Sequence, residues 1–198
     1  MGIDPLSANS LRKAVFLDRD GVLNRTVQRD GKPSPPLSLA DLDVPAETLP
    51  ALQRLAAAGF LLVVATNQPD VARGKQTQAN VEALHAHLRA SLPLDLIQVC
   101  YHDDADACAC RKPLPGMLLE AAREMGIDLT QSYMVGDRWR DVEAGQRAGC
   151  ATLYIDYGYP DRQPEQPGAI VRSLSEAAEI ILSGRLLPGP LTCSPPNS

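Results

Sequence analysis

Pairs of polar residues follow apolar, strand-like runs at three points of this sequence, and their types suit one kind of chemistry. The pairs are Asp18 and Asp20, Thr66 and Asn67, and Asp137 and Asp141. A single aspartate after a strand is usually a turn residue or a helix cap. Three such pairs in one chain instead favour a shared site, because the carboxyl ends of parallel strands meet at one edge of a sheet.

The segment Asp18-Arg19-Asp20-Gly21 places two carboxylates two residues apart, beside a glycine that permits a sharp bend. One carboxylate can attack phosphorus and form an aspartyl-phosphate, while the other protonates the leaving oxygen. Attack on a phosphate dianion needs charge neutralisation, which Mg²⁺ and a positioned lysine provide. We therefore predict phosphoryl chemistry, with Asp137 as a metal carboxylate and Lys112 as the lysine.

A second group of reactive side chains lies in residues 99–113, VCYHDDADACACRKP. Three of the five cysteines of the chain fall in this stretch, next to a histidine. Disulfides are disfavoured in a reducing cytoplasm, and an odd number of cysteines does not suit a disulfide framework. We therefore interpret the cluster as metal ligands, the alternative being reduced cysteines beside a surface histidine. Cys150 and Cys193 are interpreted as bystanders.

The elements that must position these residues alternate along the chain. Strand-like runs occupy residues 14–17, 60–65, 96–101, 133–135 and 151–155. Helix-like stretches occupy residues 46–58, 77–91, 115–125, 140–148 and 173–182, the last with a capping box from Ser173 to Glu176. This order predicts an α/β fold, a single doubly wound, Rossmann-like parallel sheet with helices on both faces.

Composition limits the classes of function. The chain has 198 residues, 44% of them hydrophobic, and a net charge of −5. No basic block is long enough to follow a nucleic-acid backbone or an anionic membrane surface. The N-terminus lacks a signal-peptide apolar stretch, and the longest apolar run, at residues 59–65, is too short to span a bilayer. We expect a cytoplasmic protein without nucleic-acid or membrane partners.

Four segments, AVFLDRDGVLN, VVATNQ, CRKP and MVGDRWRD, resemble the ordered motifs of the haloacid dehalogenase superfamily of phosphohydrolases. The resemblance covers residues 14–158 and implies a minimal cap and a monomer. It also implies that Asp18 is the nucleophile, Asp20 the general acid/base, Thr66 a phosphate hydrogen-bond donor and Lys112 the phosphate-binding cation. The predicted domain spans residues 13–183, between an extension at 1–12 and a flexible tail at 184–198.

The same resemblance implies two metal sites. Mg²⁺ would be held by the Asp18 carboxylate, the Asp20 backbone carbonyl and Asp137, with Asp141 orienting the ligands. Within the superfamily, the sequence is similar to a branch of heptose bisphosphate and histidinol-phosphate phosphatases, which carry Cys-x-His and then Cys-x-Cys before Arg-Lys-Pro. Here these residues are Cys100, His102, Cys108 and Cys110. Three thiolates and one imidazole suit a closed, structural Zn²⁺ site, so we expect a zinc-binding loop.

The substrate-facing residues follow from the same branch. The run at residues 71–75, VARGK, resembles that of heptose bisphosphate phosphatases. The candidate substrate-binding residues are Asn67, Arg73, Lys75, Arg111 and Arg138. The arginines and the lysine would form a cationic rim for a second phosphate or a polyhydroxy sugar, the alternative being solvated residues on a mobile loop. Residues 25–42 and 70–76 are the candidate covers of the site.

Other polar residues are given structural interpretations. The aspartates of the zinc loop, Asp103, Asp104 and Asp106, are interpreted as solvated, because the Cys₃His set already fills a tetrahedral site. His85 and His87 lie two apart on a helix and face different directions, so neither is a site candidate. Departures from the branch, Pro69-Asp70 and Tyr101 among them, lie in substrate-facing segments.

We thus predict a Mg²⁺-dependent phosphatase that removes the 7-phosphate of D-glycero-D-manno-heptose 1,7-bisphosphate through an aspartyl-phosphate. The alternatives are histidinol phosphate or another small sugar phosphate as the substrate, and a zinc-stabilised binding module without turnover. Nucleic-acid end processing is the weakest alternative, because the acidic chain has a single Trp and no basic groove. The anomer of the sugar and the pathway stay open.

Overall fold

The computed structural model describes residues 11–186 of the chain. Nearly all of the predicted extension at 1–12 and of the predicted tail at 184–198 therefore lies outside the described residues. Within them, no helix has both the length and the apolar character needed to cross a membrane.

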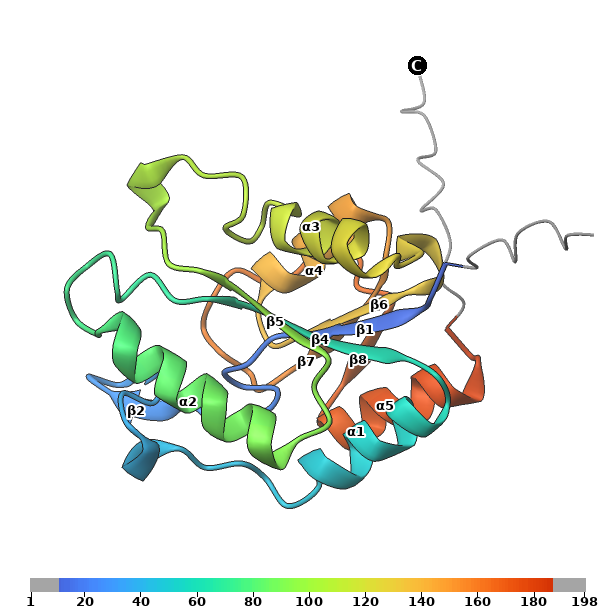
Figure 1. Ribbon diagram of the computed structural model, residues 1–198, viewed down its shortest axis with the longest axis horizontal. Helices are drawn as coiled ribbons and strands as arrows, with labels where there is room; N and C mark the ends of the chain where they lie inside the picture. Colours follow the sequence, from blue (N-terminus) through green and yellow to red (C-terminus); the bar gives the residue numbers. More distant parts are fainter. Residues whose placement is uncertain (1–10, 187–198) are drawn as a thin grey trace, which may run out of the picture.

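A six-stranded parallel sheet forms the centre of the described chain, in the order β5-β4-β1-β6-β7-β8 (Figure 1). Its strands are β1 (Ala14–Leu17), β4 (Leu61–Asn67), β5 (Leu96–Cys100), β6 (Tyr133–Gly136), β7 (Ala151–Ile155) and β8 (Ala169–Val171). All four residues of β1 are buried, as expected for a central strand that is covered on both faces. The predicted parallel α/β sheet is confirmed.

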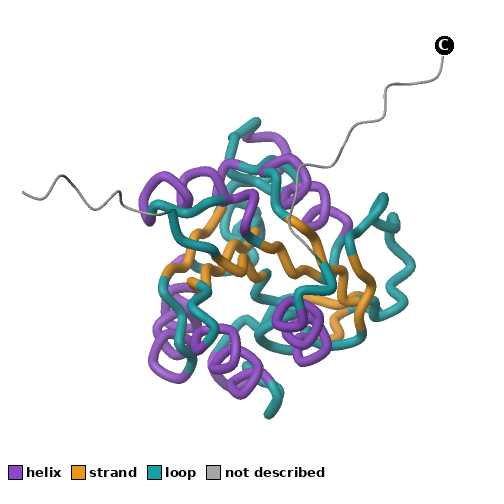
Figure 2. Tube along the Cα trace, turned by 90° about the vertical axis from the view of Figure 1, so that its right-hand side faces the viewer, coloured by secondary structure: helices purple, strands orange, loops and turns teal. Residues whose placement is uncertain are grey.

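Helices cover both faces of this sheet, as Figure 2 shows from the side. The helices are α1 (Thr48–Ala57), α2 (Gln78–Ser91), α3 (Gly116–Met125), α4 (Trp139–Ala148) and α5 (Leu174–Ser183). Apolar residues of α1, α2 and α5 share one core cluster with the sheet, and those of α3 share a second cluster on the opposite face. The predicted cap of α5 is present, because the Ser173 side chain accepts a hydrogen bond from the Glu176 backbone N–H at 3.1 Å.

Two features of the fold were not predicted from the sequence. Within the candidate cover at residues 25–42, β2 (Val27–Arg29) and β3 (Lys32–Ser34) form an antiparallel hairpin. Its turn residues Asp30 and Gly31 have φ of 51° and 70°, which is the backbone of a tight hairpin turn. The sixth strand, β8, is only three residues long and pairs with β7 at the sheet edge.

The strand order explains how distant motifs meet. Strand β1 lies between β4 and β6, and all three run in the same direction. Their carboxyl ends therefore lie side by side, and each continues into one of the polar pairs that follow the apolar runs. The sheet thus brings together residues that are more than a hundred positions apart in the sequence.

Candidate active site

The turn after β1 is fixed by its own backbone and by a close neighbour from β6. The Asp18 N–H donates to the Val135 carbonyl at 3.0 Å, and the Arg19 N–H donates to Asp18 Oδ1 at 2.8 Å. Gly21 has a φ of 89°, and a Cβ placed there would lie 2.1 Å from Asp137 Oδ2. Glycine is therefore required at this position both for the bend and for the close approach of Asp137.

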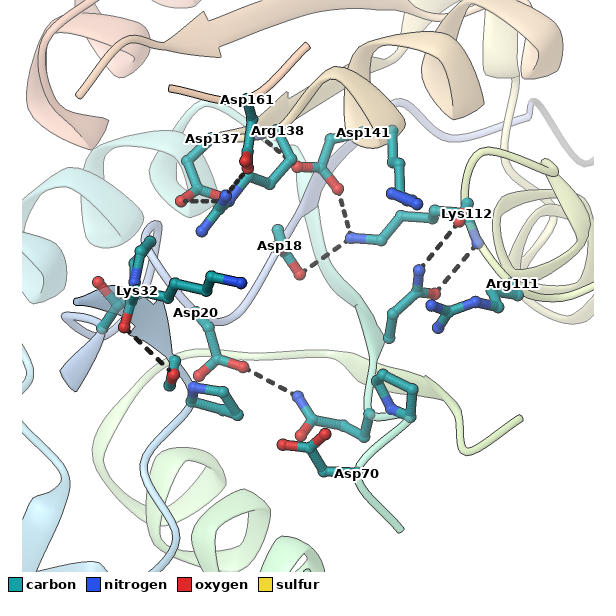
Figure 3. A pocket seen from close by; sticks show the side chains of 18 of the residues that line it. Asp18, Asp20, Lys32, Asp70, Arg111, Lys112, Asp137, Arg138, Asp141 and Asp161 are labelled. Carbon is teal, nitrogen blue, oxygen red and sulfur yellow. Dashed lines mark hydrogen bonds and ion pairs between the residues drawn. The ribbon is translucent and has the colours of Figure 1, made fainter. Parts of the chain in front are cut away.

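Lys112 is buried against the carboxylates of two strand ends. Its Nζ lies 2.9 Å from Asp18 Oδ1 and 2.5 Å from Asp141 Oδ1 (Figure 3). Burial acts to lower the pKa of Lys112, but the charges of Asp141 and Asp18 outweigh it and raise the pKa above its ordinary value. Lys112 is therefore a fixed cation in contact with Asp18.

Asn67 ties the loop that carries Lys112 to the end of β4. Its side-chain amide donates to the Lys112 carbonyl at 3.0 Å, and its oxygen accepts from the Lys112 backbone N–H at 3.1 Å. Both polar atoms of the amide are thus engaged with one peptide segment. Asn67 also lines the cavity of the site, but its observed contacts position the lysine.

The carboxylates around Lys112 fit a divalent cation. Ligand oxygens of Asp18, Asp137 and Asp141 lie within 4.8 Å of one another. Neither buried oxygen of Asp137 accepts a hydrogen bond from residues 11–186. Burial, together with the charges of Asp18 and Asp141, raises the pKa of Asp137 well above its ordinary value. Three carboxylates this close, one of them without a hydrogen-bond donor among the described residues, favour a bound cation, and oxygen ligands suit Mg²⁺.

Asp18 shares this environment. Burial raises the pKa of its carboxyl to about 6, with Lys112 acting to lower it and Asp141 and Asp20 acting to raise it. A cation bound beside Asp18 would favour its ionised form. The residues that the sequence predicted for Mg²⁺ through their side chains, Asp18 and Asp137, are thus brought together.

Asp20 is held differently from Asp18. Arg19 donates to both of its oxygens, from Nε to Oδ1 at 3.1 Å and from Nη2 to Oδ2 at 2.9 Å. The side-chain amides of Asn24 and Gln68 donate to the same carboxylate. Burial acts to raise the pKa of Asp20, but the charge and hydrogen bonds of Arg19, with those of the two amides, lower it. Gln68 also donates to Thr66 Oγ1 at 2.9 Å.

The four predicted zinc ligands converge. The ligand atoms of Cys100, His102, Cys108 and Cys110 lie within 4.8 Å of one another, with sulfur-sulfur distances of 3.1 to 3.6 Å. A tetrahedral zinc ion with bonds of about 2.3 Å places its sulfur ligands roughly 3.7 Å apart. The donor set and its spacing therefore fit a structural zinc ion, in a loop that leads directly into Arg111 and Lys112.

A cavity of about 570 Å³ opens over the carboxylates. Both predicted covers contribute to its lining, the first through Thr26 and residues 32–35 and the second through Asp70, Arg73 and Lys75. All five predicted substrate-binding residues, Asn67, Arg73, Lys75, Arg111 and Arg138, also line it. Lys32 of the β2–β3 hairpin lines the cavity as well, and it was not among the predicted site residues.

The arginines of the rim are already paired. Arg73 donates from Nε to Asp103 at 2.8 Å, and Arg111 donates from Nε to Asp104 at 2.8 Å. Arg138 pairs with Asp161. Asp104 is exposed and Asp103 is partly exposed, but the two hold rim arginines and are not merely solvated as predicted.

The class of protein follows from this geometry together with comparisons. A HAD-hydrolase-like family model matches residues 109–177. The crystal structure of a D,D-heptose 1,7-bisphosphate phosphatase from Bordetella bronchiseptica, complexed with magnesium and phosphate, superposes with a TM-score of 0.73 at 35% identity. The superposed region covers 86% of this chain and 98% of the Bordetella bronchiseptica chain. The fold and the site define a HAD-like phosphatase.

Proteins of similar sequence identify the family within this class of phosphatases. The D-glycero-beta-D-manno-heptose-1,7-bisphosphate 7-phosphatase of B. bronchiseptica is 37% identical over 86% of this chain and 98% of its own length. The protein of that name from Escherichia coli K12 is 34% identical over 85% of this chain and 93% of its own length. The D-glycero-alpha-D-manno-heptose-1,7-bisphosphate 7-phosphatase of Photorhabdus laumondii is 29% identical over 85% of this chain and 96% of its own length. The chain belongs to the D-glycero-D-manno-heptose-1,7-bisphosphate 7-phosphatase family.

Sequence reasoning missed several residues of the site. Arg19 lies inside the first motif, yet nothing in the sequence shows that its side chain turns inward to Asp20. Gln68 is the last residue of the second motif and had no assigned role. His85 was excluded because it cannot share a metal with His87, but it is buried against Arg19. Its place on the apolar face of α2, beside Leu84 and Leu88, was the available signal.

Proposed function

We propose that this protein is a Mg²⁺-dependent phosphatase that removes the 7-phosphate of D-glycero-D-manno-heptose 1,7-bisphosphate. The observation that carries the proposal is the contact of Lys112 with Asp18 beside the Asp137 carboxylate, which accepts no hydrogen bond from the described residues, in a chain of this family. The relatives at 34% to 37% identity named above act on the beta anomer, and we propose the same anomer here.

The residues act in the following order. Asp20, which the free site holds ionised, first takes up a proton. The Asp18 carboxylate then attacks the phosphorus, the bond between phosphorus and the sugar oxygen breaks, and the leaving oxygen takes this proton from Asp20. Water then attacks the aspartyl-phosphate, Asp20 takes its proton, and phosphate leaves as Asp18 is restored. Lys112 and Thr66 hold the phosphoryl oxygens throughout. When bound by Asp18, Asp137 and the Asp20 carbonyl, Mg²⁺ neutralises part of the phosphate charge.

The rest of the cavity suits a doubly phosphorylated sugar. Three arginines and two lysines, Arg73, Arg111, Arg138, Lys32 and Lys75, line it around the catalytic carboxylates. The observed arginine partners are carboxylates that are exposed or partly exposed to solvent, so exchanging such a partner for a phosphate costs little. We propose that this rim binds the distal phosphate. The predicted cytoplasmic location and monomeric state stay predictions.

The test is phosphate release from heptose 1,7-bisphosphate, as both anomers, and from histidinol phosphate, with and without Mg²⁺. We expect the wild type to prefer the beta anomer. Asp18→Asn should lower kcat by about 10³-fold or more, because it removes the attacking carboxylate. A preference for histidinol phosphate would overturn the proposed substrate. If none of the three compounds released phosphate in the presence of Mg²⁺, the alternative of a binding module without turnover would be supported.

A further inference from the structure

The side chain of Arg19 is an unusual feature of the first motif. It is completely buried, and it ranks among the largest buried side chains of residues 11–186. Two of its nitrogens hold the two oxygens of Asp20, so the guanidinium plane orients that carboxylate together with the amides of Asn24 and Gln68. Any group that fixes Arg19 therefore also fixes Asp20.

His85 of α2 is such a group. Its Nε2 lies 3.0 Å from Arg19 Nη1, the nitrogen that does not hold Asp20. Because a guanidinium only donates, the imidazole must accept through a lone pair on Nε2. The neutral ring therefore carries its proton on Nδ1, which has no hydrogen-bond partner among the described residues. Burial, and then the charge of Arg19, lowers the pKa of His85 to about 4, which keeps the ring in this accepting form near neutral pH.

The contact joins two elements that are otherwise separate in the sequence. His85 is 2% exposed and sits on the buried face of α2 with Leu84 and Leu88. A histidine on that face loses hydration, which its contact with Arg19 offsets. Helix α2 thereby reaches Asp20 through one intervening side chain.

We propose that His85 is a positioning residue of the phosphatase: by accepting a hydrogen bond from Arg19, it fixes the guanidinium that aims Asp20 at the leaving oxygen. The inference rests on the proposed phosphatase function and adds a residue to it. His85 touches neither substrate nor metal ligand, so its effect is confined to the proton transfer made by Asp20.

The dependence of kcat/KM on the leaving group distinguishes this positioning role from a purely structural one. A sugar oxygen is a poor leaving group that needs a proton, whereas p-nitrophenolate leaves without one. We expect His85→Leu to lower kcat/KM for the sugar phosphate about ten-fold, because a misplaced acid loses part of its contribution. The kcat/KM for p-nitrophenyl phosphate should change less than about two-fold. Asp20→Asn gives the upper limit of the effect on the sugar phosphate.

Two amide variants keep the test valid if the leucine variant does not fold. In His85→Gln the side-chain oxygen reaches the position of Nε2 and can accept from Arg19, whereas the shorter side chain of His85→Asn cannot. The glutamine variant should keep the wild-type ratio of the two kcat/KM values, and the asparagine variant should resemble His85→Leu. The matched control is His87→Leu, at an exposed position of the same helix, which should behave as the wild type.

Equal losses on the sugar and aryl phosphates, or equal behaviour of the glutamine and asparagine variants, would overturn the role of His85 while leaving the phosphatase intact. A wild type that hydrolysed no phosphate monoester would overturn both the proposed function and this inference.

Discussion

The ionisable side chains of the site leave a charge that a divalent cation balances. Asp20 is neutralised by Arg19, and Lys112 neutralises one further carboxylate. Of the remaining cluster, Asp18, Asp137 and Asp141 carry three negative charges when ionised against the one charge of Lys112. Burial is the main reason why the pKa values of Asp18 and Asp137 are raised here, and the surplus of negative charge adds to it. This surplus of two equals the charge of Mg²⁺.

We predict that the titration of His85 lowers the free energy of unfolding in acid. Its pKa falls from 6.5 to about 4 on folding, so the unfolded chain binds more protons between these values. The contribution of the neutral ring is complete above about pH 6.5 and is lost as the pH falls towards 4. The full shift corresponds to roughly 3 kcal/mol of unfolding free energy.

The measurement is denaturant unfolding of the wild type and of His85→Gln over this pH range. Glutamine accepts from Arg19 but does not titrate, so the difference between the two chains isolates the imidazole from the many carboxylates. The wild type should lose free energy of unfolding relative to His85→Gln as the pH falls. A difference that stayed constant would mean that His85 is not buried as a neutral ring.

At the scale of elements, the zinc loop connects metal binding to the substrate rim. The 3-10 turn η2 (Asp104–Asp106) and its cap Asp103 lie between the ligands His102 and Cys108. Asp103 and Asp104 hold Arg73 and Arg111. The loop therefore positions one arginine of its own and one from the opposite cover.

Cys110→Ser should accordingly lose the bound zinc and loosen residues 101–113. We expect the zinc content to fall from about one ion per chain, and hydrogen exchange of this loop to rise, because the site depends on all four ligands. KM for the bisphosphate should rise several-fold as Arg111 loses its support. Cys150→Ala removes a buried thiol outside the cluster and should keep both zinc and KM. Full activity and stability of a zinc-free Cys110→Ser chain would contradict this coupling.

The elements also differ in how well they could be predicted from the sequence. Strands β1, β4 and β6 were predictable because each is a continuous buried apolar run that ends at a polar pair. The β2–β3 hairpin was not, since its strands are three residues long, partly exposed and contain Pro33. His85 was judged by its distance from His87, whereas its role depends on Arg19, 66 positions away. Such a contact is set by tertiary packing and leaves no local pattern.

At the scale of the whole molecule, the sheet separates two apolar cores and leaves its carboxyl edge to charged groups. The clusters on its two faces are built from apolar side chains that are almost fully buried. The edge instead gathers carboxylates that repel one another, so the site lowers the stability of the metal-free fold. Binding that relieves this repulsion must stabilise the entire domain, because one sheet carries both cores and the site.

Magnesium should therefore raise the unfolding temperature in a saturable way. At a concentration 100 times the Kd, a ligand bound only by the folded state adds about 2.7 kcal/mol to the free energy of unfolding. Asp137→Asn should abolish this gain. Without metal this variant should unfold at a higher temperature than the wild type, since it removes a buried carboxylate that Asp18 and Asp141 repel and that accepts no hydrogen bond from the described residues. Asp161→Asn, on the cavity rim but outside the cluster, is the control and should keep the gain. A magnesium response that survived in Asp137→Asn would place the ion elsewhere, and the repulsion at the sheet edge would need another explanation.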